Sequence, residues 1–244
     1  MNNTKFYLPF LLFIFSFNTL YADININHGI TLGNDINSVL SASGKNSVIV
    51  NMTACRFKIS LKKNQHLIFN APEVIFYESK TAIKKNNLPY LWQAEMSVGY
   101  AWAFKKKAGL HEKWFGLMCE NSDNFSWTSK KTKEVSLEHE QIKNSNDLKC
   151  PASIKDGKWQ LNSQKIASNN YLFKELKGAN WSGFIVGYKN DKLKSTLDTL
   201  RFCLMHGNKV IVGASENYTK SLFLPISFFD TIQQPISTIE FVDS

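Results

Sequence analysis

Short apolar runs rich in β-branched and aromatic residues, separated by polar turns, dominate the chain from Ser47 onward. The first four runs cover Val48–Met52, Arg56–Leu61, Leu67–Phe69 and Val74–Tyr77. Runs of this length and composition are typical of β-strands. We therefore predict an α+β fold, in which antiparallel β-rich sheets are accompanied by a few short helices.

The clearest strand pattern lies between Trp92 and Phe104, where apolar and mostly large residues occupy every second position. These residues are Trp92, Ala94, Met96, Val98, Tyr100, Trp102 and Phe104. The residues between them are small or polar. Because successive side chains of a strand point to opposite sides, the pattern predicts one long strand with its large residues in a core.

Helical spacing appears in a few places between the strand-like runs. The expected helices lie between Asp35 and Gly44, within the polar stretch Ser129–Asp156, over Asp191–Leu200, and over Phe228–Ile239. Near the end of the chain, Gly207 and Asn208 separate two apolar runs. Both residues tolerate the positive φ that tight turns require, so they predict a hairpin.

The polar stretch marks a boundary between two halves. The predicted organisation is a signal peptide at 1–22, an N-terminal α+β unit at 23–128, a polar linker or helix at 129–156 and a C-terminal α+β unit at 157–244. The tripeptide at 98–100 recurs at 186–188, each time after a tryptophan and before a run that contains cysteine. Duplication of one unit and chance in an aromatic-rich β protein account for this equally well.

The first 22 residues have the pattern of a secretory signal. Lys5 gives a short positive region, Phe6–Phe17 is almost wholly apolar, and Ala22 offers the small residue that a signal peptidase needs. The apolar run is shorter than the roughly 20 residues that span a bilayer, and no second such run follows. We expect cleavage near Ala22 and release into the periplasm of a Gram-negative bacterium or the exterior, with no transmembrane segment in the mature chain.

All four cysteines lie in the predicted mature part: Cys55, Cys119, Cys150 and Cys203. An even number of cysteines in an oxidising compartment favours two disulfides over a metal site. No C-x-x-C motif occurs, which argues against zinc and thioredoxin-like chemistry. Four cysteines allow three pairings, and two duplicated units would pair Cys55 with Cys119 and Cys150 with Cys203. We expect no metal and no cofactor.

The formal net charge of the chain is +9, and removal of the signal lowers it by one. A basic surface attracts acidic proteins, anionic lipid or nucleic acid, and it also keeps an exported protein in solution. The lysines that follow the apparent long strand and those that open the polar stretch are the candidate contact residues: Lys105, Lys106, Lys107, Lys130, Lys131 and Lys133. An acidic toxin or envelope protein is the expected partner. Nucleic acid is disfavoured, and peripheral membrane contact stays open.

No nucleophile elbow, zinc-protease helix or phosphate-binding glycine loop occurs in the sequence. The candidates for acid–base chemistry are His111 with its neighbour Glu112, and His139. Two hypotheses follow. The first is a non-enzymatic periplasmic binding protein, in its sharpest form an immunity protein that neutralises a toxin of a rival bacterium. The alternative is a secreted basic hydrolase that acts on an anionic polymer or lipid and uses these three residues.

Overall fold

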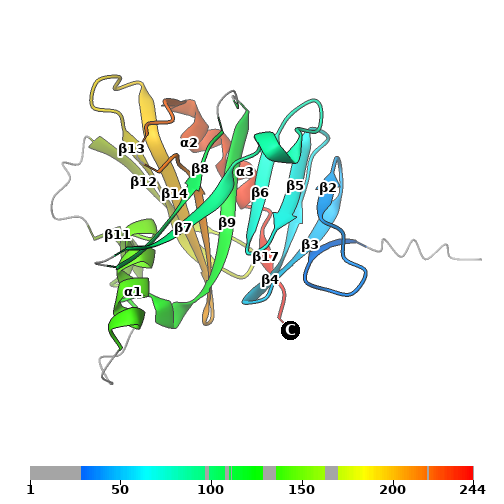
Figure 1. The fold of residues 1–244 in the computed structure, drawn as a ribbon. Coiled ribbons are helices and arrows are strands. Elements are labelled where there is room, and N and C mark those ends of the chain that lie inside the picture. The colour runs from blue at the N-terminus through cyan, green and yellow to red at the C-terminus, as the bar shows by residue number, and fades with distance from the viewer. Residues whose placement is uncertain are drawn as a thin grey trace, which may run out of the picture.

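The computed structural model describes residues 29–96, 99–107, 110, 112–128, 136–162, 170–218 and 220–243. The predicted signal at 1–22 lies outside these residues. Within them, nine strands form one antiparallel sheet, which we call the central sheet (Figure 1). Its order is β12 (Tyr171–Lys177), β13 (Ser182–Lys189), β14 (Thr196–His206), β15 (Lys209–Ser215), β9 (Lys113–Asn121), β6 (Glu73–Glu78), β5 (Gln65–Asn70) and β2 (Ser41–Ser43), with β16 (Leu224–Pro225) paired to β14.

A second sheet of four strands packs against the central sheet. Its order is β1 (Ile30–Gly33), β3 (Ser47–Met52), β4 (Cys55–Ser60) and β17 (Glu240–Phe241), and β1 runs parallel to β3. Two hairpins complete the described strands: β7 (Tyr90–Met96) with β8 (Gly99–Lys105), and β10 (Ala152–Lys155) with β11 (Lys158–Leu161). The helices are α1 (Leu137–Lys149), α2 (Ser227–Thr231) and α3 (Gln233–Ile236), with 3-10 turns η1 (Lys85–Asn87) and η2 (Ser122–Asn124). These elements confirm the predicted β-rich α+β class.

The central sheet is buried on both faces, and β9 shows how its sequence achieves this. Phe115 and Leu117 belong to one hydrophobic core, together with side chains of the four-stranded sheet, α2 and α3. Trp114 and Met118 belong to a second core, together with side chains of the β7–β8 and β10–β11 hairpins. Because neighbours along a strand face opposite sides, a strand that is apolar at nearly every position must lie in the middle of three layers. Figure 1 shows α1 and the β7–β8 hairpin on one side of the molecule and β3, β4 and β17 on the other.

The predicted cysteines form two disulfides, and each joins a different outer layer to the central sheet. Cys55 of β4 is bonded to Cys119 of β9, which ties the four-stranded sheet to one face. Cys150, at the C-terminal end of α1, is bonded to Cys203 of β14, which ties the helix to the other face. All three layers are therefore covalently connected.

The long strand predicted from Trp92 to Phe104 is wrong, because the chain reverses within it to form the β7–β8 hairpin. The register pairs Trp92 with Ala103 and Gln93 with Trp102. Directly paired residues lie on the same face of a hairpin, so even-numbered positions of β7 share a face with odd-numbered positions of β8. The reversal therefore sends Trp102 and Phe104 into the second core and leaves Trp92 on the outer face.

Two predicted helices are also absent from the described residues. The segment from Asp35 to Leu40 is a turn followed by β2, and Asn51 Nδ2 donates to the Asp35 carboxylate at 2.7 Å. That side chain therefore binds a neighbouring strand instead of capping a helix. The segment 191–195 is a turn that leads directly into β14. The helix within the polar stretch, the helical segment after residue 227 and the hairpin at 207–208 are confirmed.

The central sheet runs across the boundary predicted between the two halves. β9 of the N-terminal half pairs with β15 of the C-terminal half over six residue pairs, from Gly116–Ala214 to Asn121–Lys209. The first core draws residues from both halves as well. A common origin of the two halves stays a prediction, and in the folded chain they share one sheet.

Candidate interaction surface

The outer face of the β7–β8 hairpin brings lysines and aromatic rings together. Lys105 Nζ lies 4.0 Å from the centroid of the Trp92 ring, and Lys107 Nζ lies 5.4 Å from that of Tyr90. The register explains the first contact, since Lys105 is paired with Tyr90, two residues from Trp92 on the same face. The negative face of an aromatic ring attracts a cation, so these contacts order side chains that are otherwise mobile.

The segment after β15 adds Tyr218 to this face. Its ring centroid lies 4.3 Å from that of Trp92 and 5.0 Å from Lys105 Nζ. The Tyr218 N–H donates to the Phe104 carbonyl at 3.3 Å, and the Lys106 N–H donates to Asn217 Oδ1 at 3.0 Å. The segment is thereby fastened to the end of β8.

Tyr218 has a backbone φ of +42°, which is rare for a residue with a bulky side chain. Such a conformation costs on the order of 1–3 kcal/mol and persists where the surrounding contacts enforce it. Here the Tyr218 ring packs against Trp92 with the two ring planes tilted by 53°, and 42% of the residue stays exposed. We call this group the lysine–aromatic surface. It consists of Tyr90, Trp92, Lys105, Lys106, Lys107 and Tyr218.

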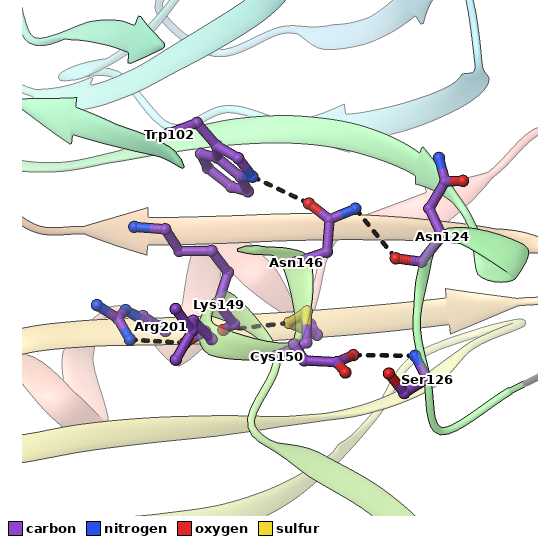
Figure 2. Close-up of a disulfide and its surroundings, with 10 residues drawn as sticks. Trp102, Asn124, Ser126, Asn146, Lys149, Cys150 and Arg201 are labelled. Carbon is purple, nitrogen blue, oxygen red and sulfur yellow. Dashed lines mark hydrogen bonds between the residues drawn. A yellow bond between two sulfur atoms is a disulfide. The ribbon is translucent and has the colours of Figure 1, made fainter. Parts of the chain in front are cut away.

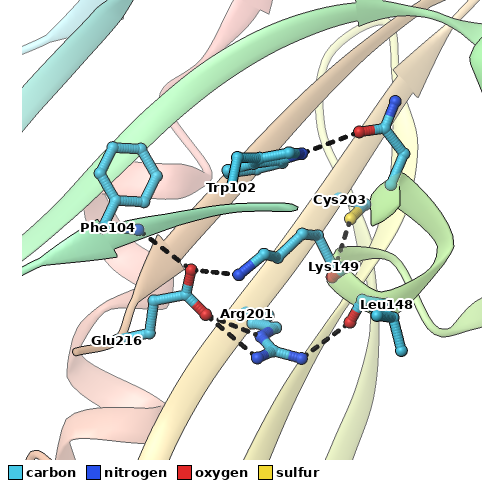
Figure 3. A network of polar contacts seen from close by, with 8 residues as sticks. Trp102, Phe104, Leu148, Lys149, Arg201, Cys203 and Glu216 are labelled. Carbon is cyan, nitrogen blue, oxygen red and sulfur yellow. Dashed lines mark hydrogen bonds and ion pairs between the residues drawn. The ribbon is translucent and has the colours of Figure 1, made fainter. Parts of the chain in front are cut away.

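A buried network of charges contacts the end of β8, next to Lys105 of this surface; Figure 3 shows the network. The Glu216 carboxylate, at the end of β15, accepts from Lys149 Nζ at 2.5 Å and from Nε and Nη2 of Arg201, both at 3.1 Å. It also accepts from the backbone N–H of Phe104 at 3.2 Å. Arg201 Nη1 in turn donates to the Leu148 carbonyl at 2.7 Å. One carboxylate therefore joins α1, β8, β14 and the end of β15.

The pKa values in this network follow from burial and from charge. The side chains of Lys149 and Glu216 are only 9% and 2% exposed. Burial lowers the pKa of Lys149 to about 8, although the charge of Glu216 opposes the change. Burial alone raises the pKa of Glu216, but the cations of Arg201 and Lys149 outweigh it and hold that pKa below its usual value. Glu216 therefore stays ionised at neutral pH.

The C-terminal end of α1 is held against the hairpin and the central sheet by several further contacts (Figure 2). Asn146 Oδ1 accepts from the indole N–H of Trp102 at 2.9 Å, and Asn146 Nδ2 donates to the Asn124 carbonyl at 3.2 Å. The Trp102 ring also lies 5.0 Å from Lys149 Nζ. Together with the disulfide at Cys150, these contacts hold the C-terminal end of α1 against β8, the strand that carries Lys105.

The network resembles an active site in one respect, since both Lys149 and Glu216 have perturbed pKa values. The charged groups of Lys149, Arg201 and Glu216 nevertheless form their hydrogen bonds and ion pairs within the network. Of its three charged residues, only Arg201 lines the open pocket between α1 and the strands β13 and β14. The arrangement therefore fits a structural joint better than a catalytic centre.

The predicted site residues have different outcomes. Lys105 and Lys107 contact rings of the lysine–aromatic surface, and Lys106 lies between them in the chain, where its backbone N–H donates to Asn217 Oδ1. The second lysine group, Lys130, Lys131 and Lys133, lies outside the described residues, as does His111. Their roles stay predictions.

The remaining hydrolase candidates lie on separate elements. Glu112 directly precedes β9, whereas His139 lies in the first turn of α1, where its backbone N–H donates to the Ser136 side chain at 3.3 Å. Among the described residues, no group of three or more His, Cys, Asp or Glu side chains is placed to hold a metal ion. In the same part of the chain, no helix is long and apolar enough to cross a membrane.

Comparisons with protein families, with characterised proteins and with solved structures find no match to this chain.

Proposed function

We propose that this protein is an exported, non-enzymatic binding protein that recognises an acidic surface of another protein through its lysine–aromatic surface. The observation that carries the proposal is the contact of Lys105 with both Trp92 and Tyr218. Tryptophan and tyrosine are among the side chains that contribute most to the binding energy of protein interfaces. Lysines at the rim of an interface also accelerate encounter with a partner of opposite charge.

The charges of this surface are available to a partner. Among the described residues, no carboxylate forms an ion pair with Lys105, Lys106 or Lys107. Tyr90 remains 39% exposed. The network around Glu216 fixes the backbone of β8 and the segment after β15. A surface ordered in this way loses little conformational entropy when it binds, which favours affinity.

The sharpest form of this proposal is an immunity protein, which binds and neutralises a toxin delivered into the periplasm by a rival bacterium. The predicted signal peptide and the two disulfides are consistent with a periplasmic location. A toxin that is blocked by this surface must present carboxylates around an apolar contact area. Toxin and immunity protein have to be produced together, so the genes adjacent to this one are the first candidates for the partner.

A protection experiment tests the proposal. Each reading frame that flanks the gene is directed to the periplasm of a test strain, and survival is compared with and without this protein. We expect one frame to kill and this protein to restore survival. The triple variant K105E/K106E/K107E should lose protection. The matched triple variant K45E/K62E/K63E changes the net charge equally at exposed lysines elsewhere and should keep it. Equal protection by both variants would contradict the binding of the toxin by the lysine–aromatic surface.

A further inference from the structure

A pocket of about 320 Å³ adjoins the lysine–aromatic surface and shares Tyr90 and Lys107 with it. Its walls come from β5, β6, η1, the residues 88–90 that lead into β7, and the segment after β8. The pocket therefore lies where the central sheet meets the open end of the β7–β8 hairpin. The inference below rests on the proposed function, because it names the chemistry of the partner group that enters this pocket.

Part of the pocket wall is apolar. Ile68 of β5 and Ile75 of β6 are directly paired, so their side chains lie on the same face of the central sheet. Leu88 packs with them in the second core and lines the pocket as well. An apolar wall offers water few hydrogen bonds, so an apolar group that replaces this water is bound favourably.

Two lysines line the same pocket, Lys85 of η1 and Lys107 after β8. Both are exposed, and neither forms an ion pair with a carboxylate within the described part of the chain. The Lys107 Nζ lies 5.4 Å from the centroid of the Tyr90 ring, which also lines the pocket. A ligand in this pocket therefore meets positive charge beside apolar surface.

One carboxylate lies near the pocket but does not line it. Glu73 is 3% exposed, and its Oε1 accepts from Asn70 Nδ2 at 2.6 Å and from the Leu91 N–H at 3.3 Å. These two bonds join the turn between β5 and β6 to the start of β7, so they hold two walls of the pocket together. The walls are therefore fixed before a ligand binds, which lowers the entropic cost of binding.

We propose that this pocket binds an apolar side chain of the partner protein that lies next to a carboxylate. The apolar side chain packs against Ile68, Ile75 and Leu88. The carboxylate stays at the exposed lysines, Lys85 and Lys107. Both parts of the occupant follow from the lining, since its charge is complementary to an anion and its apolar wall to a hydrocarbon group. A buried anchor with charged groups around it is typical of the residues that dominate protein interfaces.

Titration of the mature protein with three small probes tests this proposal. N-acetyl-leucine carries both the apolar group and the carboxylate, N-acetyl-leucinamide carries the apolar group alone, and acetate carries the charge alone. NMR follows the methyl groups of Ile68, Ile75 and Leu88 at neutral pH and constant ionic strength. We expect saturable shifts with N-acetyl-leucine and about threefold weaker binding of the amide, which loses two exposed ion pairs. Acetate should cause no saturable shift. No saturable shift with N-acetyl-leucine, or equal binding of either other probe, overturns the proposal.

Variants assign the charge preference to the two lysines of the pocket. The double variant K85Q/K107Q should bind N-acetyl-leucine and its amide equally, because it lacks both cations. K80Q/K84Q is the matched control, since Lys80 and Lys84 are exposed and do not line the pocket, and it should keep the preference for the acid. A preference that survives in K85Q/K107Q also overturns the proposal. The titration needs no partner, so its failure leaves the protection experiment as a separate test of the proposed function.

Discussion

Replacement of Glu216 by glutamine tests the buried network that supports the lysine–aromatic surface. Glutamine has nearly the same shape but no charge, so Lys149 and Arg201 would lose their shared counter-charge. Their side chains are 9% and 21% exposed. Removal of one partner from a buried ion pair typically costs 3–5 kcal/mol. Because Arg201 keeps some contact with water and its bond to the Leu148 carbonyl, we expect a loss of about 3 kcal/mol in the free energy of unfolding.

The measurement is equilibrium denaturation by urea of the mature, oxidised protein at neutral pH. Glu240→Gln is the matched control, since Glu240 is exposed and forms no ion pair within the described residues. It should change the free energy of unfolding by no more than about 0.5 kcal/mol. The double variant K149M/E216Q should be less destabilised than the two single variants together, by about 1–3 kcal/mol. A cost below about 1 kcal/mol for E216Q, or strict additivity, would refute the account of the network.

Three further predictions concern stability. Cys150 and Cys203 close a loop with a sequence separation of 53, so their joint replacement by alanine should lower the free energy of unfolding by about 4 kcal/mol and raise amide hydrogen exchange in α1. Gly157 has a φ of +74° and no atom within 4 Å of an added Cβ, so Gly157→Ala should cost about 1 kcal/mol in urea denaturation from backbone strain alone; no loss would contradict the turn geometry. Burial lowers the pKa of Lys149 from 10.5 to about 8, so between these pH values the unfolded chain binds the extra proton and the free energy of unfolding should rise with pH. Lys149→Met should lack this rise, and an equal rise in the variant would contradict the lowered pKa.

The sequence predicted β6, which is apolar at nearly every position, because burial on both faces leaves a continuous run of apolar residues. It missed the reversal between β7 and β8, because the pattern predicted one continuous strand there. The even-numbered positions are mostly large on both sides of that reversal, so the alternation of large and small residues continues through it. The positions that face the second core nevertheless change from odd-numbered in β7, such as Leu91, to even-numbered in β8, such as Trp102 and Phe104. The pairing register determines which tryptophan is buried, and a single strand's pattern does not contain that register.

The candidate site was predicted in part. Three consecutive lysines after an aromatic run marked the end of β8, and their role in binding stays a prediction. Tyr218 and Glu216 were missed because they lie more than 100 positions later in the chain and reach the hairpin only through the pairing of β15 with β9. A lone glutamate at the end of an apolar run, such as Glu216 after Ser215, was the one local signal for a buried carboxylate. Its partners on α1 and β14 follow from the tertiary fold.

The most direct test of the central claim is the association rate of the purified mature protein with the neighbouring gene product that it protects against. Surface plasmon resonance at low and at physiological ionic strength gives that rate for the unaltered protein, for K105E/K106E/K107E and for the control K45E/K62E/K63E. If the lysine–aromatic surface steers an acidic partner, the rate of the unaltered protein falls as salt is added. The first triple variant should then associate about tenfold more slowly at low salt, and the control should match the unaltered protein. Equal rates and equal salt dependence for all three proteins would contradict the proposed interaction surface.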